Sequence, residues 1–177
     1  DSSMINNDVG PLRGNDLLQG GGGADTLAGA TGADTLAGGA GNDSLLGGQG
    51  ADVLQGNQGA DVISGGLGSD VLTGGRDADS FVFASRAEVI GDRITDFSLA
   101  GGDTINLSRI DASSAARGNQ AFDFIGRAAF SGEAGELRIV LRNGETRVQA
   151  DLNGDGRADF ALVLTGEKIL TAEDFVL

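Results

Sequence analysis

Aspartate recurs every nine residues through the first half of the chain. The series runs without a slip over eight positions: Asp16, Asp25, Asp34, Asp43, Asp52, Asp61, Asp70 and Asp79. Carboxylate oxygens are hard ligands, and with backbone carbonyls they suit Ca²⁺, which takes roughly six to eight oxygens in flexible geometry. The chain has no Cys and no His, so the usual transition-metal ligands and nucleophile–base pairs are absent. The pattern therefore favours a calcium site that repeats.

A nine-residue unit surrounds each aspartate. An apolar residue follows two positions later in every copy: Leu18, Leu27, Leu36, Leu45, Leu54, Ile63, Leu72 and Phe81. The six residues Gly-Gly-x-Gly-x-Asp predict a tight turn, because glycine allows positive φ and close backbone approach. The next three predict a very short strand whose middle side chain points inward. Strict self-similarity at this period indicates a solenoid, and argues against a disordered linker or an ordinary glycine-rich sheet.

Two such units predict one flattened coil with a turn on each edge. Asp16, Asp34, Asp52 and Asp70 would then stack on one edge, and Asp25, Asp43, Asp61 and Asp79 on the other. Stacked carboxylates repel one another unless a cation lies between them. We therefore expect calcium between aspartates eighteen residues apart, about six ions in all, with carbonyl oxygens of the glycine turns as further ligands.

The expected ligand set extends beyond these aspartates. The turn glycines concerned are Gly14, Gly20, Gly23, Gly29, Gly32, Gly38, Gly41, Gly47, Gly50, Gly56, Gly59, Gly65, Gly68 and Gly74. Asp77 stands where the last copy should have its third glycine, and we expect it to add a carboxylate. Asp70 and Asp79 have no following repeat, so Asp96 or Asp103 is expected to close the final sites.

The repeat resembles a known family. The stretch GGAGNDSLLGGQGADVLQG, residues 38–56, matches the RTX nonapeptide GGxGxDxUx of the calcium-binding parallel β-roll. GGRDADSFVF, residues 74–83, is similar to the last repeat of the serralysin-type C-terminal domain. The segments DRITDFSLAGGDTINLSRIDA and FIGRAAFSGEAGELR are similar to the β-sandwich that caps the roll in those proteins. The copies depart from the pattern at Ala30 and Asn57, which replace the second glycine.

The resemblance implies an all-β fold in two parts. Residues 1–82 would form a right-handed parallel β-roll, a calcium solenoid, and residues 83–177 a β-sandwich-like cap that carries a secretion signal. Within the second part, residues 137–142 and 145–150 flank Asn143-Gly144 and predict a hairpin with a type I′ turn.

The implied function is that of a non-catalytic calcium-binding module. It would leave a bacterium through a type I ABC transporter, fold on extracellular calcium and follow an N-terminal domain of the same protein. That domain, for example a serralysin-like metalloprotease, would hold any catalytic activity. The last four residues, Asp174 to Leu177, resemble the terminal export signal of that class. An adhesive or polysaccharide-binding β-roll is the alternative, although Trp and Tyr, the usual sugar-binding aromatics, are absent.

Charge and hydropathy exclude other partners. The net charge of −14 leaves no basic patch for nucleic acid. No apolar run is long enough to predict a transmembrane segment.

A second candidate site lies in the loop DLNGDGRAD, residues 151–159. Asp151, Asn153, Asp155 and Asp159 offer oxygens with the spacing of the first part of an EF-hand calcium loop. Leu162 occupies the place of the bidentate glutamate, and the flanking segments predict strands instead of helices. The loop is therefore either a separate calcium site, the interpretation we favour, or a polar turn of the Asx type.

Overall fold

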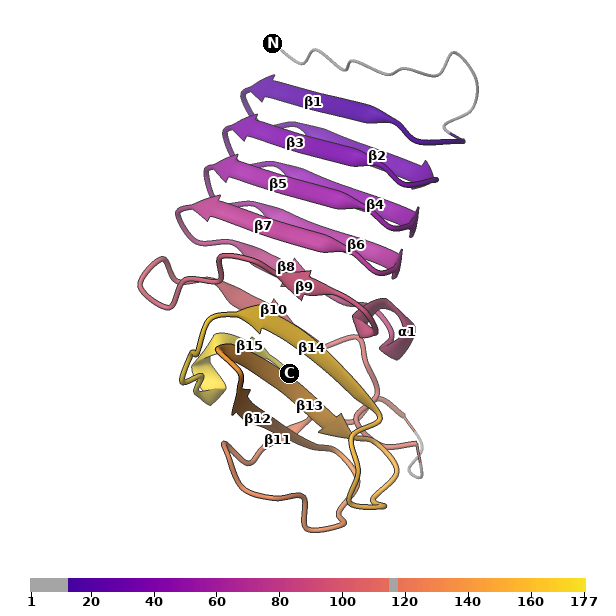
Figure 1. Ribbon diagram of the computed structural model, residues 1–177, viewed down its shortest axis with the longest axis vertical. Coiled ribbons are helices and arrows are strands. Elements are labelled where there is room, and N and C mark those ends of the chain that lie inside the picture. The colour runs from indigo at the N-terminus through magenta and orange to yellow at the C-terminus, as the bar shows by residue number, and fades with distance from the viewer. Residues whose placement is uncertain (1–12, 115–117) are drawn as a thin grey trace.

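The computed structural model describes residues 13–114 and 118–177, and Figure 1 shows strands stacked along the length of the molecule. The strands of the repeat region are β1 (Leu17–Gly22), β2 (Thr26–Thr31), β3 (Thr35–Ala40), β4 (Ser44–Gly50), β5 (Val53–Gln58), β6 (Val62–Gly68), β7 (Val71–Arg76) and β8 (Ser80–Val82). The later elements are α1 (Arg86–Val89), β9 (Arg93–Ile94), β10 (Thr104–Asn106), β11 (Asp123–Phe124), β12 (Glu136–Arg142), β13 (Glu145–Asp151), β14 (Phe160–Thr165), η1 (Ala172–Asp174) and β15 (Phe175–Val176). The predicted all-β class is confirmed.

Odd-numbered and even-numbered strands of the repeat region lie in different sheets. Strands β1 to β6 each pair in parallel with the strand eighteen residues later, so that Leu18 lies beside Leu36 and Leu27 beside Leu45. The nine-stranded sheet has the order β1-β3-β5-β7-β9-β14-β13-β12-β11, and the six-stranded sheet the order β15-β10-β8-β6-β4-β2. Two repeats therefore make one coil, and the coils stack into the predicted parallel β-roll (Figure 1).

Alternation along each strand decides what the roll buries. The aspartate, the apolar residue and the first glycine of the next unit point inward at every second position, as Asp25, Leu27 and Gly29 do. The eight apolar residues of the repeats are at most 1% exposed. One aliphatic side chain in nine residues is nevertheless a thin core, which supplies little hydrophobic stabilisation for the length of chain that it orders.

The strands of the repeats are longer than the three residues that the sequence predicts. Strands β1 to β7 contain six or seven residues, because the second glycine and the residue after it also join the ladder. Gly21 pairs with Gly39, and Gly39 with Asn57. Asn57 and Ala30 keep the left-handed conformation of the glycines that they replace, with φ of 80° and 73°. That conformation costs a residue with a β-carbon roughly 1–2 kcal/mol.

Residues 83–177 continue both sheets of the roll. β9 pairs with β7 on one side and with β14 on the other, while β10 and β15 extend the six-stranded sheet beyond β8. β12 and β13 form the predicted hairpin, and both turn residues, Asn143 and Gly144, have positive φ as a type I′ turn requires. The boundary after residue 82 stays a prediction, since strands from both sides of it share the same sheets. In the described ranges, no helix has the length and apolar character needed to cross a membrane.

Candidate metal centre

Two rows of buried aspartates follow the two edges of the roll. The first row contains Asp16, Asp34, Asp52, Asp70 and Asp92, and the second row contains Asp25, Asp43, Asp61, Asp79 and Asp103. From the second aspartate of each row onward, the Oδ1 atom accepts the backbone N–H of the aspartate one coil earlier, at 2.7–3.1 Å. All ten side chains are buried. The predicted stacking of aspartates eighteen residues apart is confirmed.

The second oxygen of eight of these carboxylates lacks a hydrogen-bond donor among the described residues. Oδ2 is buried and has no hydrogen-bond partner in the described part of the chain in Asp25, Asp34, Asp43, Asp52, Asp61, Asp70, Asp79 and Asp92. A buried carboxylate oxygen without a donor is costly, so the rows need a cation or a proton. Burial, followed by repulsion from neighbouring aspartates, raises the pKa of Asp52 to about 6, that of Asp79 to about 7 and that of Asp92 to about 8.

The first glycine of each unit leaves the space beside this second oxygen. A β-carbon built on any of these glycines would collide with the aspartate five residues later; they are Gly20, Gly29, Gly38, Gly47, Gly56, Gly65 and Gly74. At Gly47 it would lie 2.5 Å from both Asp52 Oδ2 and Gly65 O. One carboxylate oxygen and one carbonyl oxygen of the next coil therefore converge on the same space. Such a pair of hard oxygens, in a space free of side chains, fits Ca²⁺.

The third glycine of each unit provides the left-handed backbone conformation of the turn. It has positive φ in all seven copies that retain it: Gly14, Gly23, Gly32, Gly41, Gly50, Gly59 and Gly68. The coils approach so closely there that a β-carbon on Gly59 would overlap the carbonyl group of Gly41. Asp77 takes the same conformation, with φ of 75°, and its side chain is exposed. Its charge contributes to the raised pKa of Asp61, after burial and the charge of Asp43.

Among residues 13–114 and 118–177, no three carboxylate or imidazole side chains converge on one point. A cation between two coils would therefore take two carboxylates and complete its shell with backbone carbonyl oxygens. This is the donor set that the spacing of the repeat predicts.

Comparison with known proteins identifies the repeat. Residues 12–45 and 46–81 match the family model of the RTX calcium-binding nonapeptide repeat. The β-roll is an RTX calcium-binding domain. A solved structure agrees with this assignment, the AlgE6R3 subunit of the mannuronan C5-epimerase from Azotobacter vinelandii. Its sequence is 27% identical and its TM-score is 0.61, and the match covers 99% of this chain and 85% of that subunit.

Two further solved structures match the chain with lower scores. The AlgE6R2 subunit of the same epimerase is 22% identical, with a TM-score of 0.46, and the match covers 95% of this chain and 92% of that subunit. The extracellular lipase LipA from Serratia marcescens is 17% identical, with a TM-score of 0.42, over 95% of this chain and 39% of the lipase. No curated protein matches the chain.

The RTX rows end on residues outside the nonapeptides. Asp103 continues the second row, one of the two possibilities that the sequence leaves open, and Asp79 N–H donates to its Oδ1. Asp96 joins neither row; its two carboxylate oxygens accept the N–H groups of Gly74 and Gly75, each at 2.9 Å. Asp92 continues the first row, and the sequence analysis missed it. The signal was present, because Asp92 and Asp103 are each followed two positions later by a buried isoleucine.

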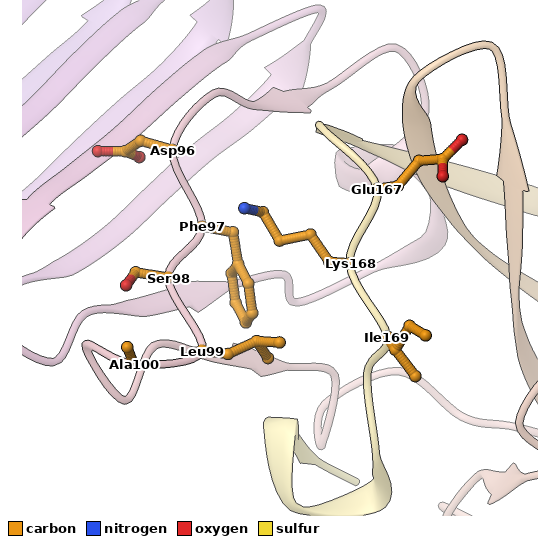
Figure 2. Close-up of a pocket in the computed structure, with 8 residues that line it drawn as sticks. All are labelled: Asp96, Phe97, Ser98, Leu99, Ala100, Glu167, Lys168 and Ile169. Carbon is orange, nitrogen blue, oxygen red and sulfur yellow. The ribbon is translucent and has the colours of Figure 1, made fainter.

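A pocket of about 500 Å³ lies beside the end of the second row. Figure 2 shows it between the 96–100 segment and the 167–169 segment, with the Lys168 side chain reaching across toward Asp96 and Phe97. Lys168 is the only lysine of the chain. Burial raises the pKa of Asp103, while the charge of Lys168 opposes that increase. The second row therefore ends near a cation that the protein itself supplies.

The loop of residues 151–159 folds on its own hydrogen bonds. Asp151, fully buried, accepts the N–H groups of Asn153, Gly154 and Gly156. Asp159 accepts Leu152 N–H, and the side chain of Asp155 accepts Arg157 N–H at 2.9 Å. These bonds are those of a succession of Asx turns. A calcium ion in this loop stays a prediction.

Proposed function

We propose that the aspartate rows hold calcium between successive coils, and that this calcium is what makes the roll fold. The observation that supports the proposal is made at the seven aspartates from Asp25 to Asp79. Each has a buried Oδ2 without a hydrogen-bond partner in the described part of the chain, and a glycine that leaves space beside it. The side chains would supply one or two oxygens to each ion, and the turn carbonyls would supply the rest. When bound, the ion provides the positive charge that the stacked carboxylates need; no chemical reaction is required of it.

Asp52→Asn should reduce the number of bound calcium ions, because Asp52 lies between Asp34 and Asp70 and borders two steps of the first row. The asparagine keeps an oxygen that can accept Asp34 N–H and removes the charge. We expect a loss of one or two ions per chain by native mass spectrometry in excess calcium. Asp123→Asn is the matched control, since Asp123 is exposed and lies outside both rows. Equal calcium counts in the two variants would contradict the ligand assignment.

The module would act outside the cell, as part of a longer exported protein. Extracellular calcium modules typically bind at about 10⁻⁴–10⁻³ M, far above cytosolic calcium. The roll would therefore stay unfolded in the cytosol, where a type I ABC transporter needs an unfolded chain, and would fold after export. An N-terminal domain of the same protein would carry any catalytic activity.

The C-terminal residues would serve as the export signal before they become part of the fold. In the folded chain Phe175 and Val176 form the edge strand β15. The ring centroids of Phe175 and Phe124 are 5.1 Å apart. Deletion of residues 174–177 should abolish export through a matching transporter. Phe124→Ala removes the packing partner and leaves the signal intact, so it should lower stability without loss of export. Full secretion of the truncated chain would leave only the structural role.

A polysaccharide-modifying parent is the second candidate, favoured by the likeness to a subunit of a mannuronan epimerase. In that case the chain should be retained on immobilised mannuronan in the presence of calcium. A chain that saturates with calcium and passes through unretarded would support the stabilising and export role alone.

A further inference from the structure

Arginines gather on the outer face of the nine-stranded sheet, where β9, β14, β13 and β12 lie side by side (Figure 1). Inward side chains of these strands, such as Ile94 and Val148, are fully buried, and the side chains between them face outward. Glu145 is the only acidic residue of the four strands that is not buried. We call the outward arginines the arginine face; they are Arg93, Arg138, Arg142 and Arg147.

The total charge of the chain conceals this basic surface. From the net charge of −14 the sequence analysis expected no basic patch. That expectation was wrong for this face, because the sheet brings together strands that are far apart in the sequence: β9 pairs with β14, about seventy residues later. Four arginines and one glutamate leave the face with an excess of positive charge.

Glu145 orients two of the arginines. Arg93 Nη2 donates to its Oε1 at 2.8 Å, and Arg147 Nη2 donates to its Oε2 at 3.3 Å. The hydrogen bond from Arg93 is the main cause that lowers the pKa of Glu145, so the carboxylate stays ionised. The side chains of Arg93 and Arg147 are still 39% and 43% exposed. One carboxylate thus positions two guanidinium groups and balances the charge of only one.

Neutral groups position a third arginine. Arg138 Nε and Nη2 donate to Gln149 Oε1 at 3.1 and 3.0 Å. The guanidinium carbon of Arg138 lies 4.1 Å from the centre of the Phe130 ring. Neither partner cancels the charge of Arg138. Arginines that are already held in place lose little conformational freedom when they bind a ligand, so the face is prepared for an anion.

The spacing of the charges indicates which kind of anion fits. Val163 of β14 pairs with Arg93 on one side and with Arg147 on the other, which places these arginines two strands apart, about 10 Å. The hydroxyl of Thr165 and the carboxylate of Glu145 lie beside them and can bind sugar hydroxyls. A nucleic acid strand carries a phosphate about every 3.4 Å, and Glu145 would repel so dense a charge. Widely spaced carboxylates separated by hydroxyls fit this face better.

The neighbouring part of the roll extends the surface without acidic side chains. The outward residues of β5 and β7 are uncharged: Val53, Gln55, Val71 and Thr73. A polymer that lies on the arginine face therefore meets no repulsion where it continues over these strands.

We propose that the arginine face binds a linear polysaccharide that carries carboxylates, with Arg93, Arg138 and Arg147 as the principal contacts. Planar guanidinium groups bind carboxylates through paired hydrogen bonds. The inference rests on the polysaccharide candidate of the proposed function, for which it names the binding residues and the chemical class of ligand. It uses no residue of the aspartate rows.

The double variant Arg93→Gln/Arg147→Gln tests the proposal in surface plasmon resonance, with oligogalacturonate immobilised by its reducing end and millimolar CaCl₂ in the buffer. The dissociation constant should rise roughly tenfold, since two exposed charge pairs with the ligand are lost. Arg109→Gln is the matched control and should bind as the wild type does, because Arg109 is exposed and follows β10 of the other sheet. Methyl-esterified oligogalacturonate, which has the same backbone without the charges, should bind much more weakly. Circular dichroism reports whether each variant is folded.

Arg142→Gln provides the second test, for the case in which the double variant does not fold. Arg142 is exposed at the end of β12, so the sheet should form and the dissociation constant should still rise several-fold. Wild-type affinity in the folded variants would overturn the assignment to this face and leave the polysaccharide candidate standing. A wild type that does not bind oligogalacturonate, or that binds single-stranded DNA more tightly, would refute the inference. The calcium role is tested separately, by the ion count of Asp52→Asn.

Discussion

Removal of calcium at pH 7.5 should unfold the roll. Eight aspartates bury an oxygen that has no hydrogen-bond partner in the described structure. Each such group costs roughly 1–3 kcal/mol, so together they cost on the order of 10 kcal/mol, which is comparable with the whole stability of a typical domain. The thin core of one aliphatic side chain per repeat cannot offset this cost.

Circular dichroism measures the expected change. The strand signal should be lost in excess EGTA and should return with millimolar CaCl₂ in a cooperative transition. Magnesium at the same concentration should be much less effective, because it demands a regular octahedron of ligands and gives up its water reluctantly. A strand signal that is unchanged in EGTA would show that the rows are stable without a cation.

Acid should partly replace calcium. In the folded chain burial raises the pKa of Asp52 to about 6, that of Asp79 to about 7 and that of Asp92 to about 8, whereas in the unfolded chain aspartate titrates near its ordinary value of about 4. The folded state therefore holds these protons more tightly. Their contribution to stability is complete below about pH 4 and is lost as the pH rises through 6 to 8. Each group contributes a few kcal/mol by this route.

The experiment uses protein that has been freed of calcium on a chelating resin, since EGTA binds calcium poorly in acid. The strand signal should increase as the pH falls from 8 to about 4.5. Sodium chloride at 1 M and pH 8 is the control, because it screens exposed charges and leaves buried ones largely unaffected. Refolding in salt alone, or no refolding in acid, would show that the buried carboxylates are not what opposes folding.

The repeat region could be predicted because its period matches its geometry. Two units of nine residues make one coil, so the interval of eighteen places Asp34 next to Asp52 and Leu36 next to Leu54. The predicted length of the strands was wrong, because the sequence analysis assigned the glycine pair to the turn alone. Glycines that are needed for space beside a carboxylate, such as Gly47, also keep their place in the sheet.

The end of the roll could be predicted only in part. Asp92 stands twenty-two residues after Asp70, because α1 and its flanking residues interrupt the period of nine. The pairing of β9 with β14 joins Arg93 to Val163. No local pattern records a contact over that distance. The contacts of Asp96 could not be predicted for the same reason. Its carboxylate accepts the N–H groups of Gly74 and Gly75 only because the chain returns to β7 after α1.

Anomalous diffraction at a long wavelength, from crystals grown in CaCl₂, tests the central claim most directly. Calcium peaks should lie along both edges of the roll, each between aspartates of successive coils. Each peak should be close to one carboxylate oxygen and to a carbonyl oxygen of a glycine turn. A folded roll without peaks along the two rows, or with metal bound only elsewhere, would contradict the account.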